Sequence, residues 1–131
     1  AGFRRDAAEE MLAHLGISRG QRIRQMSKGT REKVQLILVM SRKARLYLLD
    51  EPIGGVDPAS REYILNTIIT NYNPEASIII TTHLIADIEP VLDDFAFMTY
   101  GGDIVRMGNA DTVREATGKT LDELFREEFR C

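Results

Sequence analysis

Apolar residues recur along this chain at two different spacings, and the alternation predicts helices and strands in turn. Helical spacing over residues 3–15 predicts a first helix, with Gly16 where glycine commonly ends one. A second helix is predicted to open at residues 27–30 and to run to about Arg42. Its middle, residues 34–40, is apolar on most faces, which is typical of a buried helix.

Two short apolar segments on either side of a helical one predict a βαβ unit. Residues 46–50 favour a buried strand because the first four are apolar on both faces, and residues 77–82 favour a second one. Between them, Asp57 and Pro58 supply an N-cap and a first-turn proline, so a helix is expected there until the break at residues 73–74. Strands joined in this way pair in parallel, and the fold class is therefore α/β.

The last third of the chain predicts a hairpin and short helices. A helix over residues 84–92 contains Pro90, which is expected to bend or shorten it. Two strands flank the turn at residues 101–103, and two closing helices follow. The second closing helix begins with a capping-box pair, Thr120 and Glu123.

Two adjacent carboxylates, Asp50 and Glu51, stand at the end of the first predicted strand. They lie at its carboxyl end, which is the edge where open α/β sheets bind ligands. Adjacent acids at such an edge can have different roles: one can hold a metal ion while the other takes a proton from water. A solvated acidic turn is the alternative that these two residues alone leave open.

Charge is divided unevenly along the 131 residues. Residues 1–45 contain 11 Lys and Arg against 4 Asp and Glu, a balance of +7, whereas residues 46–131 contain 6 against 16, a balance of −10. Two solvated surfaces of opposite charge explain this pattern simply, and a basic surface facing nucleotide phosphates is the functional alternative. Nucleic acid is not expected as a partner, because Phe3 is the only aromatic residue in the basic part that could stack on bases.

Neither an intrachain disulfide nor membrane insertion is expected. The single cysteine, Cys131, has no partner in the chain, which fits a reducing compartment. The longest uninterrupted apolar run, residues 36–40, is far shorter than a membrane-spanning helix. Any role at a membrane would therefore depend on a partner protein.

Three further segments contain candidate residues: 26–30 (MSKGT), 53–57 (IGGVD) and 81–84 (TTHL). Each has a simpler structural explanation. The serine of the first segment and the aspartate of the second could be N-caps alone, and the glycine pair could form only a turn. A single histidine after a strand is more commonly a hydrogen-bonded turn residue than a catalytic one.

Taken in order with LYLLDEP at residues 46–52, these segments resemble the nucleotide-binding domain of the ATP-binding-cassette (ABC) ATPases. MSKGT resembles the LSGGQ signature, and LYLLDE resembles the Walker B strand with its catalytic glutamate. IGGVD resembles the D-loop, TTHL resembles the switch-histidine loop, and the hairpin resembles the strand pair that follows in transporter ATPases. The resemblance covers about residues 5–120. It implies a parallel sheet of the P-loop NTPase type, part of a helical subdomain, and a C-terminal β-hairpin with helices.

The chain departs from the family pattern in two respects. Lys28 stands where glycine is usual and Thr30 where glutamine is usual, whereas Ser27 and Gly29 are retained. No segment matches the phosphate-binding loop G-x-x-x-x-G-K-[ST], and the first strands, the adenine-stacking aromatic residue and the glutamine loop have no counterpart either. The resemblance therefore implies an incomplete domain.

That incomplete domain would be the C-terminal portion of one ABC ATPase domain. Residues 1–45 would be helical subdomain with the signature, residues 46–108 the catalytic core strands, and residues 109–131 the C-terminal helices. Because it lacks the phosphate-binding loop, the chain alone is expected to be inactive as an ATPase.

The resemblance also implies a role for each acid and for the histidine. Asp50 would orient Mg²⁺, through water, because Mg²⁺ gives up its hydration shell reluctantly. Glu51 would be the general base toward the attacking water. His83 would contact the γ-phosphate of ATP and hold that water in line.

The remaining candidates would bind nucleotide across a dimer. In the family, two domains pair head to tail, and the signature of one caps the γ-phosphate held by the other. Ser27, Lys28, Gly29 and Thr30 would form that signature, at a helix start whose free N–H groups attract an anion. Asp57 would lie at the interface and link the two sites.

The function implied is the ATP-binding and ATP-hydrolysing subunit of an ABC transporter, with ATP and Mg²⁺ as ligands. Its partners would be a second ABC ATPase domain and a transmembrane permease subunit. The protein would be cytoplasmic and held at the inner face of the cell membrane through the permease.

Two alternatives remain open. A soluble ABC ATPase of DNA repair or translation is disfavoured by the uninterrupted motifs and the hairpin, and heptad repeats upstream would reverse that preference. A non-catalytic module with the same fold is disfavoured because Asp50, Glu51, Asp57 and His83 all remain chemically competent.

Overall fold

The computed structural model describes residues 3–18, 20–71 and 74–129, with only the backbone of residues 67–71. The chain divides into two compact units, Ala1–His83 and Leu84–Cys131. The expected helix break at Asn73 and the terminal Cys131 lie outside the described residues. The expected domain boundaries after residues 45 and 108 stay predictions.

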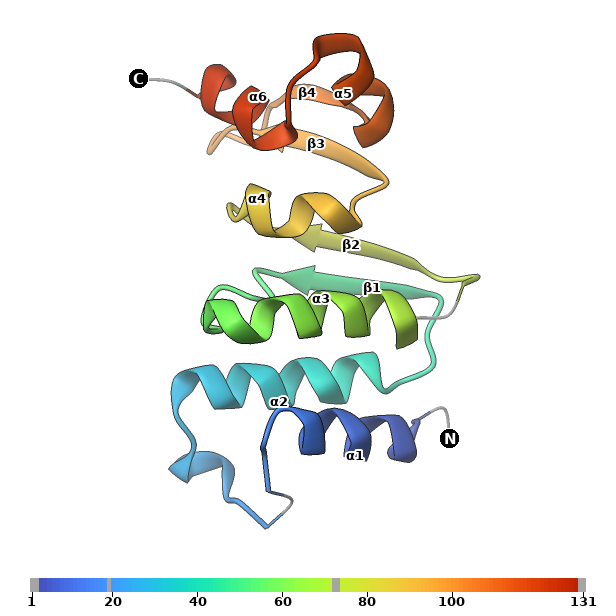
Figure 1. Cartoon of the computed structure of the whole chain (residues 1–131), viewed down its shortest axis with the longest axis vertical. Coiled ribbons are helices and arrows are strands. Elements are labelled where there is room, and N and C mark those ends of the chain that lie inside the picture. Colours follow the sequence, from blue (N-terminus) through green and yellow to red (C-terminus); the bar gives the residue numbers. More distant parts are fainter. Residues whose placement is uncertain (1–2, 19, 72–73, 130–131) are drawn as a thin grey trace. The chain divides into compact units, whose positions relative to one another are not determined.

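The described part of the first unit combines helices with a two-stranded parallel sheet (Figure 1). Its elements are α1 (Arg5–His14), the 3-10 helix η1 (Ile23–Gln25), α2 (Lys28–Met40), β1 (Leu46–Asp50), α3 (Pro58–Asn71) and β2 (Ser77–Thr81). In the parallel register, Leu48 lies opposite Ile79 and Asp50 lies opposite Thr81. The predicted βαβ unit and the α/β fold class are confirmed, and both strands end at the same edge.

The prediction that β1 is buried on both faces is wrong. Tyr47 and Leu49 are buried, whereas Leu46 and Leu48 are 50% and 67% exposed. Ile79, the neighbour of Leu48 on β2, is 54% exposed as well. The strand pair thus has one covered and one open face, because burial of a second face depends on which other segments lie against it.

α2 was expected to be buried on most faces, and this is also corrected. Leu36, Ile37 and Met40 are buried, but Leu38 and Val39 are exposed. The helix ends at Met40, before the predicted end at residue 42. Its neighbours cover one side only, which an apolar sequence does not reveal.

α1 and α2 share a small apolar cluster, formed by Ala8, Met11 and Ile37. As predicted, Gly16 follows the end of α1 with a φ of 71°, a left-handed conformation that glycine adopts without a steric penalty. Phe3 was predicted in the apolar stripe of this helix, but it precedes α1 and is 47% exposed. It forms an isolated antiparallel bridge with Arg42 instead.

The second unit contains the predicted hairpin and short helices. Its described elements are α4 (Ile85–Ile88), the 3-10 helix η2 (Glu89–Val91), β3 (Asp94–Met98), β4 (Ile104–Asn109), α5 (Ala110–Thr117) and α6 (Leu121–Glu128). β3 and β4 pair antiparallel, and Pro90 ends the regular helix early, as expected. The capping box of α6 is present, because Thr120 and Glu123 exchange two hydrogen bonds of 3.1 Å.

An apolar core holds the second unit together. Its buried members are Phe97, Ala110, Leu121 and Leu124. Among the helices that the structure describes, none is both long and apolar enough to cross a bilayer.

Candidate functional site

Glu51, Thr82 and His83 meet where β1 and β2 end. Thr82 Oγ1 donates to Glu51 Oε2 at 2.9 Å, and the His83 amide donates to Glu51 Oε1 at 3.0 Å. His83 Nδ1 lies 2.6 Å from the same Oε1. Because an ionised carboxylate only accepts hydrogen bonds, Nδ1 carries the proton in this contact. The two residues predicted to be catalytic are therefore direct neighbours.

The backbone of Glu51 is unusual. Its φ is 48°, the only positive value at a non-glycine residue among those the structure describes. Such a conformation costs roughly 1–3 kcal/mol and is found where surrounding contacts enforce it. Two such contacts are present: the Glu51 amide donates to the Thr81 carbonyl oxygen at 2.7 Å, and the Gly54 amide donates to the Glu51 carbonyl oxygen at 3.2 Å.

The environment of Glu51 favours the charged carboxylate. Partial desolvation raises the pKa of Glu51, but the hydrogen bonds from His83 and Thr82 outweigh it and hold that pKa below its ordinary value. The side chain of His83 is 72% exposed and that of Glu51 is 37% exposed, so the pair is open to solvent. Glu51 is therefore ionised at neutral pH, as a proton acceptor must be.

We expect the stabilising effect of Glu51 to depend on pH. Since the folded-state pKa is lowered, the contribution is complete above the ordinary value of 4.5 and is lost as the pH falls through the folded-state pKa. Urea unfolding of wild type and Glu51→Gln should thus give a larger difference at pH 7 than at pH 3. Glu115→Gln, at an exposed position of α5, is the matched control. An equal difference at both pH values would contradict this interpretation.

Asp50 occupies the open face of the strand pair, with Leu46 and Leu48. Thr81 Oγ1 donates to Asp50 Oδ1, so the two residues that are opposite in register also contact through their side chains. A carboxylate with a neighbouring hydroxyl is an oxygen-rich set of the kind that Mg²⁺ prefers. The described residues contain no cluster of three or more His, Cys, Asp or Glu side chains. The expected role of Asp50 toward Mg²⁺ stays a prediction.

The segment at residues 27–30 begins α2, and Ser27 is its N-cap. The Thr30 amide donates to Ser27 Oγ at 3.2 Å, and Ser27 Oγ donates to Thr30 Oγ1 at 2.9 Å. Lys28, the first residue of the helix, is exposed. The structural explanation left open for Ser27 is thus present, and its role toward a ligand stays a prediction.

Asp57 is held within its own chain by both carboxylate oxygens. Its Oδ2 accepts from the Ser60 amide at 3.1 Å, which confirms the predicted N-cap of α3. Its Oδ1 accepts from Lys33 Nζ at 2.9 Å. The hydrogen bond from Lys33 is the main reason why the pKa of Asp57 lies below its ordinary value. The expected interface role of Asp57 stays a prediction.

The start of α2 and the loop at residues 53–57 approach each other closely. A Cβ atom added at Gly29 would lie 2.8 Å from the backbone oxygen of Gly55. A Cβ atom at Gly55 would lie 1.9 Å from Oε2 of Glu32. The structure thus assembles the candidates into two clusters, one around Glu51 and one where α2 meets this loop.

Gly29→Ala is expected to destabilise the protein by about 1–3 kcal/mol, because a backbone oxygen cannot yield as a side chain can. The gain in helix propensity, about 0.5–1 kcal/mol, opposes this but is smaller. Urea unfolding measures the net effect. Gly20→Ala is the control, since the nearest atom to its added Cβ is Ser18 Oγ at 3.9 Å. A stabilised Gly29→Ala protein would mean that the close approach is not maintained.

Sequence reasoning named the segment at residues 81–84 but gave Thr81 and Thr82 no role of their own, and it did not single out Lys33. Paired threonines at the end of the second predicted strand were a usable signal, since parallel register places Thr81 opposite Asp50 and Thr82 then reaches Glu51. Lys33 had no comparable signal, because it is one of 11 Lys and Arg residues in the first 45 positions.

The chain is similar to known proteins in sequence and in fold. A family model described as "AAA domain, putative AbiEii toxin, Type IV TA system" matches residues 4–86, more than half of the chain. An uncharacterised ABC transporter ATP-binding protein of Bacillus subtilis, YhaQ, is 26% identical over 88% of this chain and 40% of its own length. The ABC-type transporter ATP-binding protein EcsA of the same organism is 30% identical over 77% of this chain and 42% of its own length.

A solved structure described as the ATP binding subunit of an ABC transporter is similar as well. It superposes with a TM-score of 0.77 at 27% identity, over 93% of this chain and 52% of that one. The chain spans about two fifths of the length of the curated relatives it matches. The chain therefore belongs to the family whose model is described as an AAA domain, and it is a member of the ATP-binding-cassette ATPases.

Proposed function

We propose that the complete protein is the ATP-binding and ATP-hydrolysing subunit of an ABC transporter, and that this chain contributes part of its nucleotide site. The observation that carries the proposal is the pairing of Glu51 with His83 at the carboxyl edge of a parallel strand pair. This is the edge where open α/β sheets bind ligands. The names of the relatives support transport over the soluble and non-catalytic alternatives.

In this function, Glu51 accepts a proton from the attacking water. A general base must be ionised and within hydrogen-bonding reach of its substrate, and the exposed, hydrogen-bonded carboxylate satisfies the first condition. Thr82 and His83 restrict the rotation of the carboxylate by binding both of its oxygens. Glu51 is thereby oriented before the substrate arrives.

His83 has a second nitrogen available for a substrate. Its Nδ1 faces Glu51, so Nε2 is the ring atom free to contact the γ-phosphate or the water. A ring held on one side by a carboxylate stays in one orientation, and positioning supplies much of the catalysis in phosphoryl transfer.

Asp50 would hold Mg²⁺, with Thr81 keeping its carboxylate in place. When bound, Mg²⁺ neutralises charge on the phosphates. The start of α2, with Ser27, Lys28 and Gly29, would supply a positive helix end to the nucleotide of a second ABC ATPase domain. Asp57 would lie between the two domains, close to that helix end.

Movement of a transmembrane permease partner would follow closure of the two ATPase domains. The subunit would be peripheral at the inner face of the cell membrane through that partner. Because no segment of the chain matches G-x-x-x-x-G-K-[ST], the complete nucleotide site would need residues from outside this chain, and the chain alone should not hydrolyse ATP efficiently.

Calorimetry with Mg-ATP tests the proposal, using this chain and a version lengthened upstream by its natural sequence. We expect no binding to the chain alone and binding to the lengthened protein. Tight binding to the short chain would mean that its site is already complete, contrary to the proposal. Absence of binding by both would contradict an ATPase and favour the non-catalytic module.

A further inference from the structure

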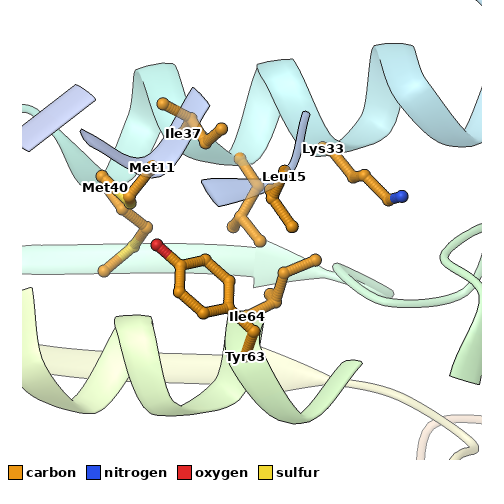
Figure 2. Close-up of a pocket in the computed structure, with 8 residues that line it drawn as sticks. Met11, Leu15, Lys33, Ile37, Met40, Tyr63 and Ile64 are labelled. Atoms are coloured by element: carbon orange, nitrogen blue, oxygen red, sulfur yellow. The ribbon is translucent and has the colours of Figure 1, made fainter. Parts of the chain in front are cut away.

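Lys33 connects the interior of the first unit with the loop at residues 53–57. Its side chain is only 15% exposed, and it borders an apolar pocket formed by α1, α2 and α3 (Figure 2). Figure 2 shows its nitrogen directed away from the apolar side chains, among them Met40 and Tyr63. The ammonium group reaches Asp57 at 2.9 Å, so the charged end binds the loop while the stem borders the core.

The loop also approaches α2 closely at a second point nearby. Gly29, one helical turn before Lys33, lies so close to Gly55 that a Cβ atom would meet the Gly55 oxygen at 2.8 Å. Between Gly55 and Asp57, Val56 is 2% exposed, and Ile53 just before them is fully buried. This part of the loop therefore has little freedom to move independently of α2.

Glu51 follows β1 directly and lies two residues before the loop at residues 53–57. Glu51 has a φ of 48°, and its carbonyl oxygen accepts from Gly54 within the loop. The Glu51 amide is bonded to β2 and the Glu51 carbonyl oxygen is bonded to Gly54, so a displacement of the loop acts on the backbone at Glu51. The orientation of the Glu51 side chain is therefore coupled to the position of residues 53–57.

From these contacts we infer that Lys33 is a positioning residue for hydrolysis: through Asp57 it holds the loop at residues 53–57 against α2, and so fixes the orientation of Glu51. The inference rests on the proposed function. It also adds a role to Asp57, whose two oxygens are engaged by Lys33 and Ser60 within the same chain.

A purely structural role for Lys33 is the competing explanation. Asp57 is 54% exposed, and salt bridges with an exposed partner contribute little to stability. A structural lysine would alter the unfolding midpoint without affecting turnover. A positioning lysine would lower kcat while leaving the KM for ATP nearly unchanged, since it contacts no nucleotide.

The test uses the complete protein with Lys33→Met, which keeps an apolar stem and removes the charge. We expect kcat to fall by roughly tenfold to a hundredfold, the range for a catalytic group misplaced by about 1 Å, with KM for ATP within about twofold. Lys33→Arg keeps the ion pair and should retain most of the activity. Lys43→Met, at an exposed position before β1, is the matched control and should resemble wild type.

Hydrogen exchange in the peptide covering residues 51–57 supplies a readout that does not depend on catalysis. Faster exchange in Lys33→Met but not in Lys43→Met supports the inference. Unchanged exchange, or unchanged kcat in an active protein, overturns it. If Lys33→Met does not fold, Asp57→Asn replaces it, because asparagine preserves the N-cap of α3 and loses the ion pair.

The two hypotheses fail in distinguishable ways. A complete wild-type protein without ATPase activity contradicts the proposed function. In that case, hydrogen exchange in residues 51–57 alone decides whether Lys33 holds the loop. An active wild type whose Lys33→Met variant is equally active contradicts only the role of Lys33.

Discussion

Replacing Glu51 with glutamine in the complete protein is expected to lower ATP hydrolysis by about 10²–10⁴-fold while leaving ATP binding intact, the range for loss of a general base. Glutamine has nearly the same size and shape as glutamate, so the left-handed backbone and the loop that follows can persist. Its amide cannot take a proton from water. Phosphate release measures hydrolysis, and calorimetry with Mg-ATP measures binding.

The substitution also changes the local hydrogen bonds. Oε1 of Glu51 accepts from the His83 amide and contacts His83 Nδ1, whereas Oε2 accepts from Thr82. Glutamine has only one oxygen, so its NH₂ group must face one of these donors unless the side chain or the imidazole rearranges. Glu115→Gln, on the exposed side of α5, controls for the loss of one negative charge. Normal turnover by Glu51→Gln would remove Glu51 from the role of base.

Replacing His83 with alanine is expected to lower turnover by about 10–10²-fold through lost positioning of the substrate and of Glu51. The hydrogen bond from the ring is one of the contacts that lower the pKa of Glu51, so this pKa should rise toward its ordinary value. The shift should be incomplete, because the amide of residue 83 and Thr82 still donate. Steady-state ATPase kinetics and NMR titration of the Glu51 carboxyl measure the two effects.

His83→Asn separates the two roles of the histidine. Its side-chain amide can donate to Glu51 as Nδ1 does, but it offers no second ring nitrogen to a phosphate. We expect the pKa of Glu51 to stay low in this variant while turnover remains impaired. Unchanged kinetics in His83→Ala would instead favour the simple explanation of a hydrogen-bonded turn residue.

Local signals predicted most of the elements correctly. Asp57 caps α3, Pro58 is its first residue, and Pro90 shortens the helix it interrupts. Thr120 and Glu123 form the expected capping box. Each signal acts through backbone groups within a few positions of the residue itself, so the surrounding sequence is sufficient to read it.

Exposure was predicted less well, and the reason is the same for β1 and α2. Leu48 and Leu38 are apolar yet exposed, because burial depends on partners elsewhere in the chain rather than on the residue itself. Phe3 matched the helical spacing of α1, but its backbone pairs with Arg42 instead. Spacing alone could not exclude that longer-range pairing.

The sequence by itself determined which groups are available for chemistry and in what order: two acids at the end of a strand, a capped helix start, a glycine-rich loop and a histidine. It also determined the parallel βαβ arrangement, since a strand, a helix and a strand with short connections have few other ways to pack.

Only the tertiary structure decided which of these groups meet. Glu51 and His83 are 32 positions apart, and Lys33 and Asp57 are 24 apart, yet both pairs are in contact. Contacts of this kind depend on strand register and on the closeness of two backbones, which Gly29 and Gly55 permit because they lack a Cβ atom. The close approach of two backbones results from the packing of the whole unit, which no single segment determines.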